Sequence, residues 1–488
     1  MSPAGRPLRV IQVTRLAQGG GAERVASSLH EGLRRRGHRS WMATARPSDD
    51  PSILTIPPPP TRPTGIVPRA LVRAAERLGP GRERGALVRT LQRGLRFAAA
   101  PRRTLDKRRG RESFDYPGTA AIPDLTPEPP DLLHCHNLHG GFFDLRQLEP
   151  LSHRLPLAMT LHDEWTFTGH CAYALYGDRW RSGCVSCPDL SIYPAIAHDG
   201  TRANLEAKRR IYRRSRLYVT TPSQWLMDRA QASAVAEGAA GWRVIANGID
   251  RSTFKPADAR HARARLGLPS EPFILLFAAN NARRSPFKDF PTVSRAAVEV
   301  AARVTSRPVL CLALGDTGPT ESFPNGELRF VPYENDADQT AAYYQAADLY
   351  LHAAKAENLP TTILEALATG LPVVATAVGG VPEEVRSLMG APGGWSGAGH
   401  PRADATGVLA APGDGIGMGA AAAAILADDG LRATLSGNAV RDAALRFDLE
   451  QQLDSTISWY HEIIADWSAR ERTLGPPRAI TPPERRHV

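Results

Sequence analysis

The amino-acid sequence predicts an α/β protein built from two doubly wound halves, each a parallel sheet covered by helices on both faces. Short apolar segments rich in Val, Ile and Leu recur along the chain, and segments with helical periodicity separate them. The first apolar segment runs into a glycine cluster and then a helix, which is typical of sheets that bind ligands at the carboxyl ends of parallel strands. A cleft between the two halves is therefore the expected place for an active site.

Length and composition are those of a globular enzyme. The 488 residues are too many for one hydrophobic core, and 42% hydrophobic with 23% charged residues excludes a mostly disordered, collagenous or coiled-coil chain. We find no run of about 18 uninterrupted apolar residues and no signal-peptide-like apolar core near the start. Five cysteines are few, as in reduced compartments. We therefore expect a cytoplasmic protein.

The N-terminal half begins with a complete strand–helix–strand unit. Residues 8–14 form its first expected strand, and Gly19–Gly21 follow. Val25, Leu29 and Leu33 then recur every four residues on one helical face, and the helix is expected to end at Gly37, four residues after Leu33. The further strands expected in this half are residues 40–45, 131–136, 157–163, 217–223 and 242–250.

The C-terminal half repeats the strand–helix alternation. Its expected strands are residues 273–279, 308–314, 327–333, 348–354 and 371–377. The predicted boundaries are a Rossmann-like domain over 1–255 with an insertion at about 47–130, a second over 256–449, a helix over 450–467 that crosses back to the first domain, and a disordered tail over 468–488.

The positive charge of the chain is concentrated in the insertion. Residues 61–115 contain 15 Lys+Arg and 5 Asp+Glu, so their net charge of +10 equals that of the whole protein. This favours a local anionic partner and no nucleic acid. Within 66–111, Arg alternates with Leu and Val, which fits either basic amphipathic helices lying on an anionic membrane or a solvated, poorly ordered excursion. Both interpretations remain open.

Two segments carry the candidate chemistry. Gly19–Gly21 either presents amide groups to a phosphate or sugar, or only makes a tight turn, and its spacing does not favour NAD. In the segment 356–385, a helix is expected to begin near Thr361 or Thr362, and its first-turn amides suit a diphosphate. Glu357 lies in the preceding loop and Glu365 in the second turn. The alternatives are an exposed loop acid for Glu357 and a capping box for Glu365.

The segment ENLPTTILEALATGLPVVATAVGGVPE resembles the nucleotide-sugar site of the retaining family-4 glycosyltransferases, which have the GT-B fold with two Rossmann-like domains facing a central cleft. The two glutamates match the E-x7-E motif of that family. Its other hallmarks follow in order: GGGAERVASSLHEGLRRRGH, DLLHCHNLHGGFFDL, TLHDEWTFTGHCAY, GCVSCPDL, VTTPSQWL and VIANGID. The resemblance covers roughly residues 8–46 and 113–465 and is closest to the colanic acid and exopolysaccharide branch.

The resemblance implies roles for particular residues. Glu357 would bind hydroxyls of the donor sugar, Glu365 the ribose, and His162 would face the reacting carbon. Lys288, with Arg283 or Arg284, matches the basic pair that neutralises the leaving diphosphate, although Asp289 replaces the usual glycine after the lysine. No metal or cofactor is implied. The remaining residues expected at the donor are Gly20, Gly21, Asn358, Leu359, Pro360, Thr361 and Thr362.

The resemblance also implies an activity. The N-terminal domain would hold the acceptor, and the enzyme would transfer a hexose from a nucleotide sugar, with retention, to a saccharide in exopolysaccharide or cell-surface polysaccharide synthesis. The acceptor would be linked to undecaprenyl diphosphate, which would make the enzyme peripheral on the inner leaflet of the plasma membrane. The alternatives are a nucleotide-sugar 2-epimerase on the same fold and a degenerate, non-catalytic binding protein.

Three cysteines form a C-x12-C-x2-C pattern at Cys171, Cys184 and Cys187. Such spacing can serve zinc, but a structural zinc site needs four ligands. Relatives in this branch often carry a cysteine where this chain has Gly177, so His170 or His198 would have to supply the fourth ligand. Buried free thiols are the favoured interpretation.

Overall fold

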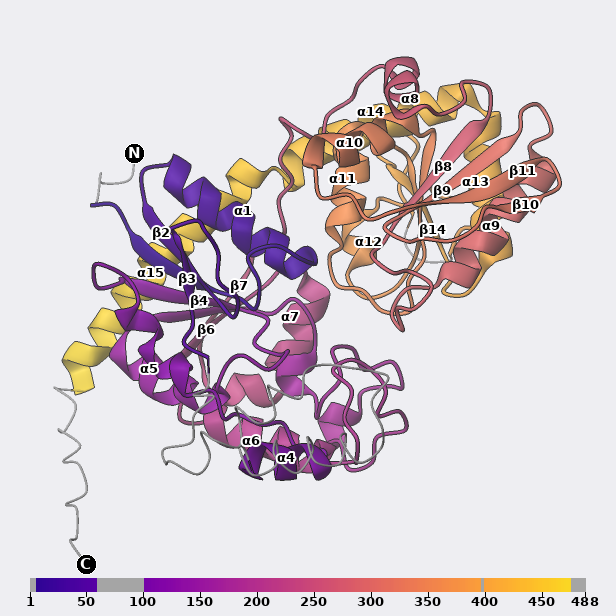
Figure 1. Ribbon diagram of the computed structural model, residues 1–488. Coiled ribbons are helices and arrows are strands. Elements are labelled where there is room, and N and C mark those ends of the chain that lie inside the picture. Colours follow the sequence, from indigo (N-terminus) through magenta and orange to yellow (C-terminus); the bar gives the residue numbers. More distant parts are fainter. Residues whose placement is uncertain (1–5, 59–100, 396–398, 475–488) are drawn as a thin grey trace, which may run out of the picture.

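The computed structural model describes residues 6–58, 101–395 and 399–474 and contains two α/β domains. Figure 1 shows the N-terminal domain in indigo and magenta and the C-terminal domain in orange, with helix α15 returning from the second domain to the first. The GT-B architecture predicted from the sequence is confirmed. Residues 66–100, which we expect to be partly helical, lie outside the described residues.

The N-terminal domain is built on a parallel sheet whose strand order is β3-β2-β1-β4-β5-β6-β7. Its strands consist mainly of β-branched and other apolar residues, which suits a sheet buried on both faces. The strands are β1 (Arg9–Val13), β2 (Arg39–Thr44), β3 (Ile53–Thr55), β4 (Leu132–His136), β5 (Leu157–Thr160), β6 (Leu217–Thr221) and β7 (Ala239–Val244).

Helices cover both faces of this sheet. Helix α1 buries Val25, Leu29 and Leu33, the stripe expected from the sequence, and Gly37 follows its last turn with a φ of +81°. The helices of this domain are α1 (Gly21–Arg35), α4 (Pro101–Arg108), α5 (Leu148–Arg154), α6 (Thr201–Tyr212) and α7 (Gln224–Gln231).

The C-terminal sheet has the order β10-β11-β9-β8-β12-β13-β14 and is parallel except for β10. Alternate residues of β8 enter opposite core clusters: Phe273, Leu275 and Phe277 on one face, Ile274 and Leu276 on the other. Its strands are β8 (Phe273–Ala278), β9 (Val309–Leu314), β10 (Glu321–Phe323), β11 (Gly326–Val331), β12 (Leu349–His352), β13 (Val373–Thr376) and β14 (Gly407–Ala410).

Aspartates begin several helices of this domain. Asp258, Asp336, Asp414 and Asp428 each accept a backbone N–H of the first helical turn, which satisfies donors that have no partner within the helix. The helices are α8 (Ala259–Leu266), α9 (Phe290–Arg303), α10 (Ala337–Ala346), α11 (Thr361–Thr369), α12 (Val381–Glu384), α13 (Gly415–Ala427), α14 (Asp429–Arg446) and α15 (Leu449–Leu474).

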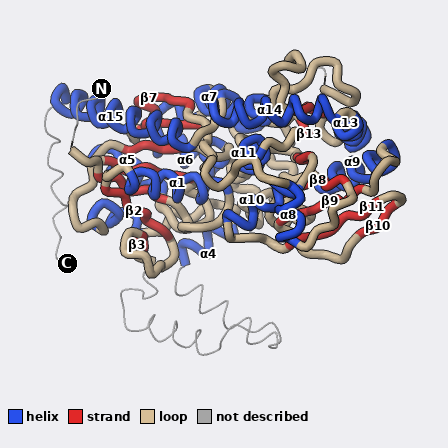
Figure 2. Tube along the Cα trace, turned by 90° about the horizontal axis from the view of Figure 1, so that it is seen from above, coloured by secondary structure: helices blue, strands red, loops and turns tan. Residues whose placement is uncertain are grey.

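The chain crosses between the domains twice, and the two crossings pair with each other. The Ile249 amide donates to the Phe447 carbonyl at 2.8 Å, and the Leu449 amide donates to the Ile249 carbonyl at 3.1 Å. Helix α15 then packs Trp459, Tyr460 and Ile463 into the core of the N-terminal domain. Figure 2 shows α15 beside β7. Among the described helices, none is long and apolar enough to span a membrane.

Three expectations need correction. Residues 53–55, assigned to the insertion, form the edge strand β3, because Ile53 and Leu54 pair with Met42 and Ala43. The strand expected over 242–250 is β7 at 239–244, and the chain beyond it forms the first crossing. Helix α15 also continues past residue 467 to Leu474, into the expected disordered tail. Its last turns are held by an ion pair between Arg216 and Glu471 at 2.7 Å.

Gly248 permits the close approach of the two crossings. A Cβ atom there would lie 2.6 Å from Leu449 Cα, a backbone atom that cannot move aside. We expect Gly248→Ala to lower the free energy of unfolding by about 1–3 kcal/mol through overpacking, as measured by denaturant titration. Gly437→Ala is the control, because a Cβ at this exposed helical glycine of α14 meets nothing within 4 Å and should be neutral or stabilising. Equal stability of both variants would contradict this account of the crossing.

Candidate active site

The topology of the two sheets places ligand-binding loops opposite each other. Strand order reverses between β1 and β4 in the first sheet and between β8 and β12 in the second. In doubly wound sheets, ligands bind beyond the carboxyl ends of the strands at such a reversal. Here Gly19–Gly21 follows β1, Ala279 and Asn280 follow β8, and Glu357 follows β12.

These loops enclose a cleft of about 280 Å³ between the domains. It contains Gly20 and Gly21 from the N-terminal domain, and Lys288, Glu357 and the start of α11 from the C-terminal domain. The residues lining it are Gly19, Gly20, Gly21, Arg24, Ala278, Ala279, Asn280, Lys288, Leu314, Gly315, Tyr333, Glu334, Thr340, Glu357, Pro360, Thr361, Thr362 and Glu365.

Glu365 is buried and paired across the cleft. Its Oε1 accepts from Arg24 Nη1 at 2.8 Å, and only 3% of its side chain is exposed. Burial raises the pKa of Glu365, and the Arg24 guanidinium opposes that shift. Helix α11 begins at Thr361, after Pro360 as its N-cap, without a side-chain cap. The capping box considered as an alternative for Glu365 is therefore not formed.

Glu357 lies at the far side of the same cleft and forms an ion pair with Lys288. The exposed fractions of the two side chains are 16% and 18%, so the pair is mostly shielded from water. Lys288 is held in place because its backbone forms a bridge with Ala354, just beyond β12. Glu357 is thus not an ordinary exposed loop acid.

Two glycines explain how the Glu357 loop is supported. Gly379 has a φ of +58°, and a Cβ there would lie 1.7 Å from the Glu357 carbonyl oxygen. A Cβ at Gly380 would lie 2.3 Å from the Asn358 carbonyl oxygen. Only glycine permits the segment after β13 to pack directly beneath the backbone that carries Glu357.

Asn358 and Leu359 connect the domains instead of lining the cleft. Asn358 Nδ2 donates to the His162 carbonyl at 3.2 Å, and Ser223 Oγ donates to Asn358 Oδ1 at 2.5 Å. Asn247 Nδ2 donates to the Leu359 carbonyl at 2.9 Å. The Asn358 side chain therefore fixes the start of the α11 segment against the end of β5 and the start of α7.

His162 belongs to a buried hydrogen-bonded chain. Gln12 Nε2 donates to the Tyr460 hydroxyl at 3.1 Å, and Gln12 Oε1 lies 2.9 Å from His136 Nε2. With Gln12 accepting, His136 Nδ1 accepts in turn from His162 Nε2 at 3.0 Å. Burial lowers the pKa of His162 to about 4 and that of His136 well below 6.5, so both imidazoles are neutral at pH 7.

Neither arginine expected beside Lys288 lines the cleft. The Arg283 side chain lies 3.5 Å from Asp316 Oδ1, contacts the Thr317 carbonyl and stacks on Phe330. Arg284 is exposed. The cationic side chains in the cleft wall are Lys288 and Arg24. Sequence reasoning missed Arg24, although it lies three residues after the glycine cluster in the quoted segment GGGAERV.

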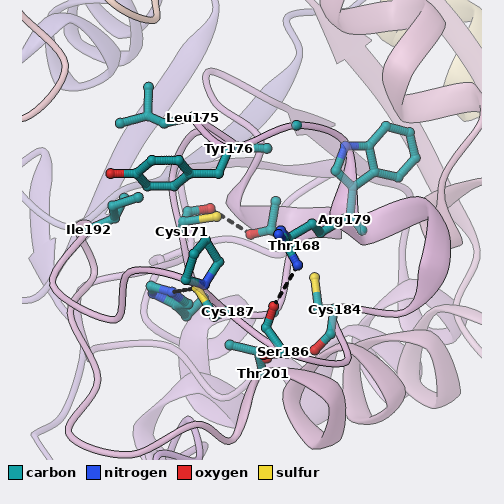
Figure 3. A pocket seen from close by; sticks show the side chains of 16 residues that line it. Thr168, Cys171, Leu175, Tyr176, Arg179, Cys184, Ser186, Cys187, Ile192 and Thr201 are labelled. Atoms are coloured by element: carbon teal, nitrogen blue, oxygen red, sulfur yellow. Dashed lines mark hydrogen bonds between the residues drawn. The ribbon is translucent and has the colours of Figure 1, made fainter.

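The three cysteines lie around a separate small cavity of about 40 Å³ (Figure 3). His170 Nε2 lies 3.2 Å from Cys187 Sγ. Burial raises the pKa of Cys171 to about 12 and also raises the pKa values of Cys184 and Cys187, which opposes the thiolate form that zinc requires. Within the described residues, no three His, Cys, Asp or Glu side chains are arranged to hold a metal ion.

The fold is that of the GT-B class, and comparison with known families assigns both domains to glycosyltransferase families. Residues 19–253 match the sequence model of Glycosyltransferase Family 4, and residues 320–441 match that of Glycosyl transferases group 1. The two matches fall on the two domains. The chain belongs to these glycosyltransferases.

Individual relatives match parts of the chain. The putative colanic acid biosynthesis glycosyl transferase WcaC of Escherichia coli K12 is 28% identical over 264 residues, 51% of this chain and 60% of that protein. D-inositol 3-phosphate glycosyltransferase 1 of Catenulispora acidiphila is 34% identical over 166 residues, 31% of this chain and 39% of that protein. The chain thus spans less than two thirds of the length of both relatives.

Solved structures share the fold over nearly the whole chain. Sucrose-phosphate synthase of Thermosynechococcus elongatus superposes with a TM-score of 0.55 at 18% identity, covering 94% of this chain and 99% of that one. Anabaena HepE in complex with UDP and glucose superposes with a TM-score of 0.54 at 17% identity, covering 92% and 98%.

The buried histidines predict a pH-dependent stability. The pKa of His134 is lowered to about 3 by burial, so below about pH 6.5 the unfolded chain binds a proton there that the folded protein does not. The contribution of His134 to the free energy of unfolding is therefore complete above about pH 6.5 and decreases as the pH falls below that value. We expect His134→Asn to be less stable than the wild type at pH 7.5, with a smaller difference at pH 5, in denaturant titrations.

Comparing the wild type with His134→Asn isolates the contribution of His134 to the pH dependence of stability. Buried carboxyls such as Glu365, whose pKa is raised by burial, act in the opposite direction, but they are present in both proteins. A stability difference that is the same at pH 7.5 and pH 5 would contradict the prediction.

The cysteine cavity predicts a protein without structural zinc. We expect elemental analysis of protein purified without added metal to find zinc well below one equivalent, and Cys184→Ser to lower stability only mildly. A buried thiol replaced by a hydroxyl loses little packing, whereas loss of a structural zinc ligand would remove much of the folding free energy. Stoichiometric zinc would overturn this interpretation.

Proposed function

We propose that this protein is a retaining glycosyltransferase that moves a hexose from a nucleotide-sugar donor to a saccharide acceptor in exopolysaccharide or cell-surface polysaccharide synthesis. The observation that carries the proposal is the arrangement of Glu357, Glu365 and the start of α11 in one cleft opposite Gly20 and Gly21. The sequence similarity to a colanic acid enzyme supports the polysaccharide assignment. In this proposal the donor is held in the cleft, with its sugar at Glu357 and its ribose at Glu365.

When the donor binds, the charged side chains of the cleft would exchange partners, and each of them would still have a partner of its own. Lys288 would leave Glu357 for the diphosphate while sugar hydroxyls donate to the Glu357 carboxylate. Arg24 would likewise leave Glu365 for the diphosphate while the ribose hydroxyls donate to Glu365. Two cations and the first-turn amides of α11 would then stabilise the leaving nucleoside diphosphate, and this stabilisation grows as the sugar–phosphate bond breaks.

The neutral state of His162 suits this chemistry. Positive charge develops at the sugar carbon in the transition state, and a protonated imidazole beside that carbon would repel it. The low pKa of His162, which burial causes, keeps the ring uncharged at neutral pH. The diphosphate oxygen would take the proton of the acceptor hydroxyl on the same face of the sugar, so no covalent nucleophile or metal is assigned.

The alternative activities have distinct signatures. A nucleotide-sugar 2-epimerase on this fold would release an epimerised sugar without an acceptor, and a degenerate protein would bind without turnover. Thermal-shift measurements with UDP-, GDP- and TDP-sugars would identify the nucleotide. Chromatography of the sugar product would then separate epimerisation from transfer.

The two glutamates are expected to differ in role. Glu357→Ala should lower transfer at least about tenfold while nucleoside diphosphate binding remains, because it removes a charged hydrogen bond to the sugar worth about 1.5–3 kcal/mol. Glu365→Ala should mainly weaken nucleotide binding, as measured by calorimetry. Glu327→Ala is the control, since Glu327 lies outside the cleft wall and pairs with Arg329 on the surface. Unchanged turnover in Glu357→Ala would refute the assignment.

The acceptor is proposed to be linked to undecaprenyl diphosphate, with the enzyme bound peripherally to the inner leaflet. This proposal rests on the charge of the insertion, most of which lies outside the described residues. Eight arginines between Arg69 and Arg96 alternate with apolar residues, and each basic residue near an anionic membrane adds about 1 kcal/mol.

Replacing these eight arginines by glutamine tests the membrane proposal without removing residues 101–111, which belong to the folded part of the domain. We expect the wild type to sediment with anionic vesicles in a salt-sensitive manner and the variant to lose this binding, while nucleotide affinity is unchanged. If both proteins sediment equally, or neither does, the insertion has no role in membrane binding.

A further inference from the structure

One carboxylate in the wall of the interdomain cleft has no role in the proposed donor contacts. Three glutamates line the cleft, namely Glu334, Glu357 and Glu365. Glu357 forms an ion pair with Lys288, and Glu365 forms one with Arg24. Within the described part of the chain, Glu334 forms no ion pair, and part of its surface is exposed. The Glu334 carboxylate is therefore accessible to a ligand and is not neutralised by the protein.

The order of the strands places Glu334 at the opposite end of the cleft from Glu357. Glu357 follows β12 and Glu334 follows β11, and strands β9 and β8 lie between these two strands in the sheet. Three strand spacings correspond to about 14 Å. Arg24 connects Glu365 to the Glu334 end, because its Nη1 contacts Glu365 at 2.8 Å and its Nη2 donates to the Tyr333 hydroxyl at 3.4 Å.

This arrangement follows the order of groups in a nucleotide sugar. Such a molecule has the sugar at one end and the base at the other, with the diphosphate and the ribose between them. In the proposed function the sugar lies at Glu357 and the ribose at Glu365. The base then extends towards Tyr333 and Glu334, which form the remaining end of the cleft wall.

The Glu334 carboxylate is held in place by the start of helix α10. Its Oε1 accepts the Asp336 amide at 2.9 Å. Asp336 is the N-cap of α10, and its carbonyl accepts from Thr340 Oγ1 at 2.9 Å. Thr340 lines the same cleft. Each carboxylate oxygen has two lone pairs, so Oε2 and the second lone pair of Oε1 remain for a ligand.

A carboxylate at this position distinguishes between the bases. Guanine carries two adjacent donors on one edge, the N1–H group and the 2-amino group, and a carboxylate accepts two parallel N–H groups at once. Uracil and thymine carry one N–H between two carbonyl oxygens, and these oxygens repel a carboxylate. Adenine has one amino group beside a ring nitrogen that only accepts. Guanine therefore fits the Glu334 carboxylate best.

We propose that Glu334 recognises the base of the donor and that the donor is a guanosine-diphosphate sugar. The inference rests on the proposed function, because the placement of the sugar and the ribose defines where the base lies. It makes Glu334 a specificity-determining residue, separate from Glu357 and Glu365, which bind groups that all nucleotide sugars of hexoses share.

Calorimetry on the full chain with GDP, inosine diphosphate and UDP tests the proposal. Inosine diphosphate differs from GDP only in lacking the 2-amino group, so it removes one of the two donors without any change in the protein. Glu334→Gln removes the carboxylate charge at nearly constant size. Asp338→Asn is the matched control, because Asp338 is an exposed acid in the first turn of α10 and does not line the cleft.

We expect the wild type and Asp338→Asn to bind GDP at least about tenfold more tightly than inosine diphosphate and UDP. In Glu334→Gln, GDP affinity should fall at least about tenfold, to that of inosine diphosphate, while UDP affinity does not fall. Each hydrogen bond to a charged group that is lost accounts for a change of this size.

Two results would overturn the inference while leaving the proposed function in place. The first is wild-type protein that binds UDP as tightly as GDP or more tightly. The second is a preference for GDP over inosine diphosphate that persists in Glu334→Gln. If Glu334→Gln does not fold, equal affinities of the wild type for GDP and inosine diphosphate still refute the role of Glu334. Wild-type protein that binds none of the three nucleotides would refute the proposed function as well.

Discussion

The contact between Arg24 and Glu365 is the constraint on which the geometry of the interdomain cleft depends. Glu365 is almost fully buried, and a buried carboxylate needs a charged partner to remain ionised. That partner comes from the first turn of α1 in the other domain, so the two domains must stay close enough for a 2.8 Å contact. Asn358 and Glu383 add to this link, since Glu383 accepts the first amides of α7 across the same interface.

The loop after β5 connects the domain interface to the core of the N-terminal domain. The His162 carbonyl accepts from Asn358 of the other domain, and Trp165 belongs to the hydrophobic core. Asp163 lies between them, and its Oδ1 accepts the Trp165 amide at 2.9 Å. The buried chain from His162 through His136 and Gln12 to Tyr460 anchors the loop to α15.

The sequence predicted the fold well, because most strands are apolar and glycines mark the strand ends. It missed β14, since Gly407–Ala410 is short and begins with glycine, and it missed β10 at the sheet edge. Glu357 and Glu365 were predicted together because they lie in one continuous segment. Arg24 was not, because its partner is 341 residues away and only the domain arrangement brings them together. The expected place of Arg283 beside Lys288 was not found, because the Arg283 side chain pairs with the Asp316 carboxylate instead. No spacing in the sequence indicates that pair.

The return of α15 to the N-terminal domain has a consequence for biosynthesis. The apolar surface formed by Leu8, Val10 and Leu33 is covered by Trp459, Tyr460 and Ile463, which follow the second domain in the chain. The first domain therefore emerges from the ribosome with part of its core exposed and keeps it exposed while the whole second domain is being translated. During that interval the nascent chain presents an apolar patch of the kind that chaperones bind.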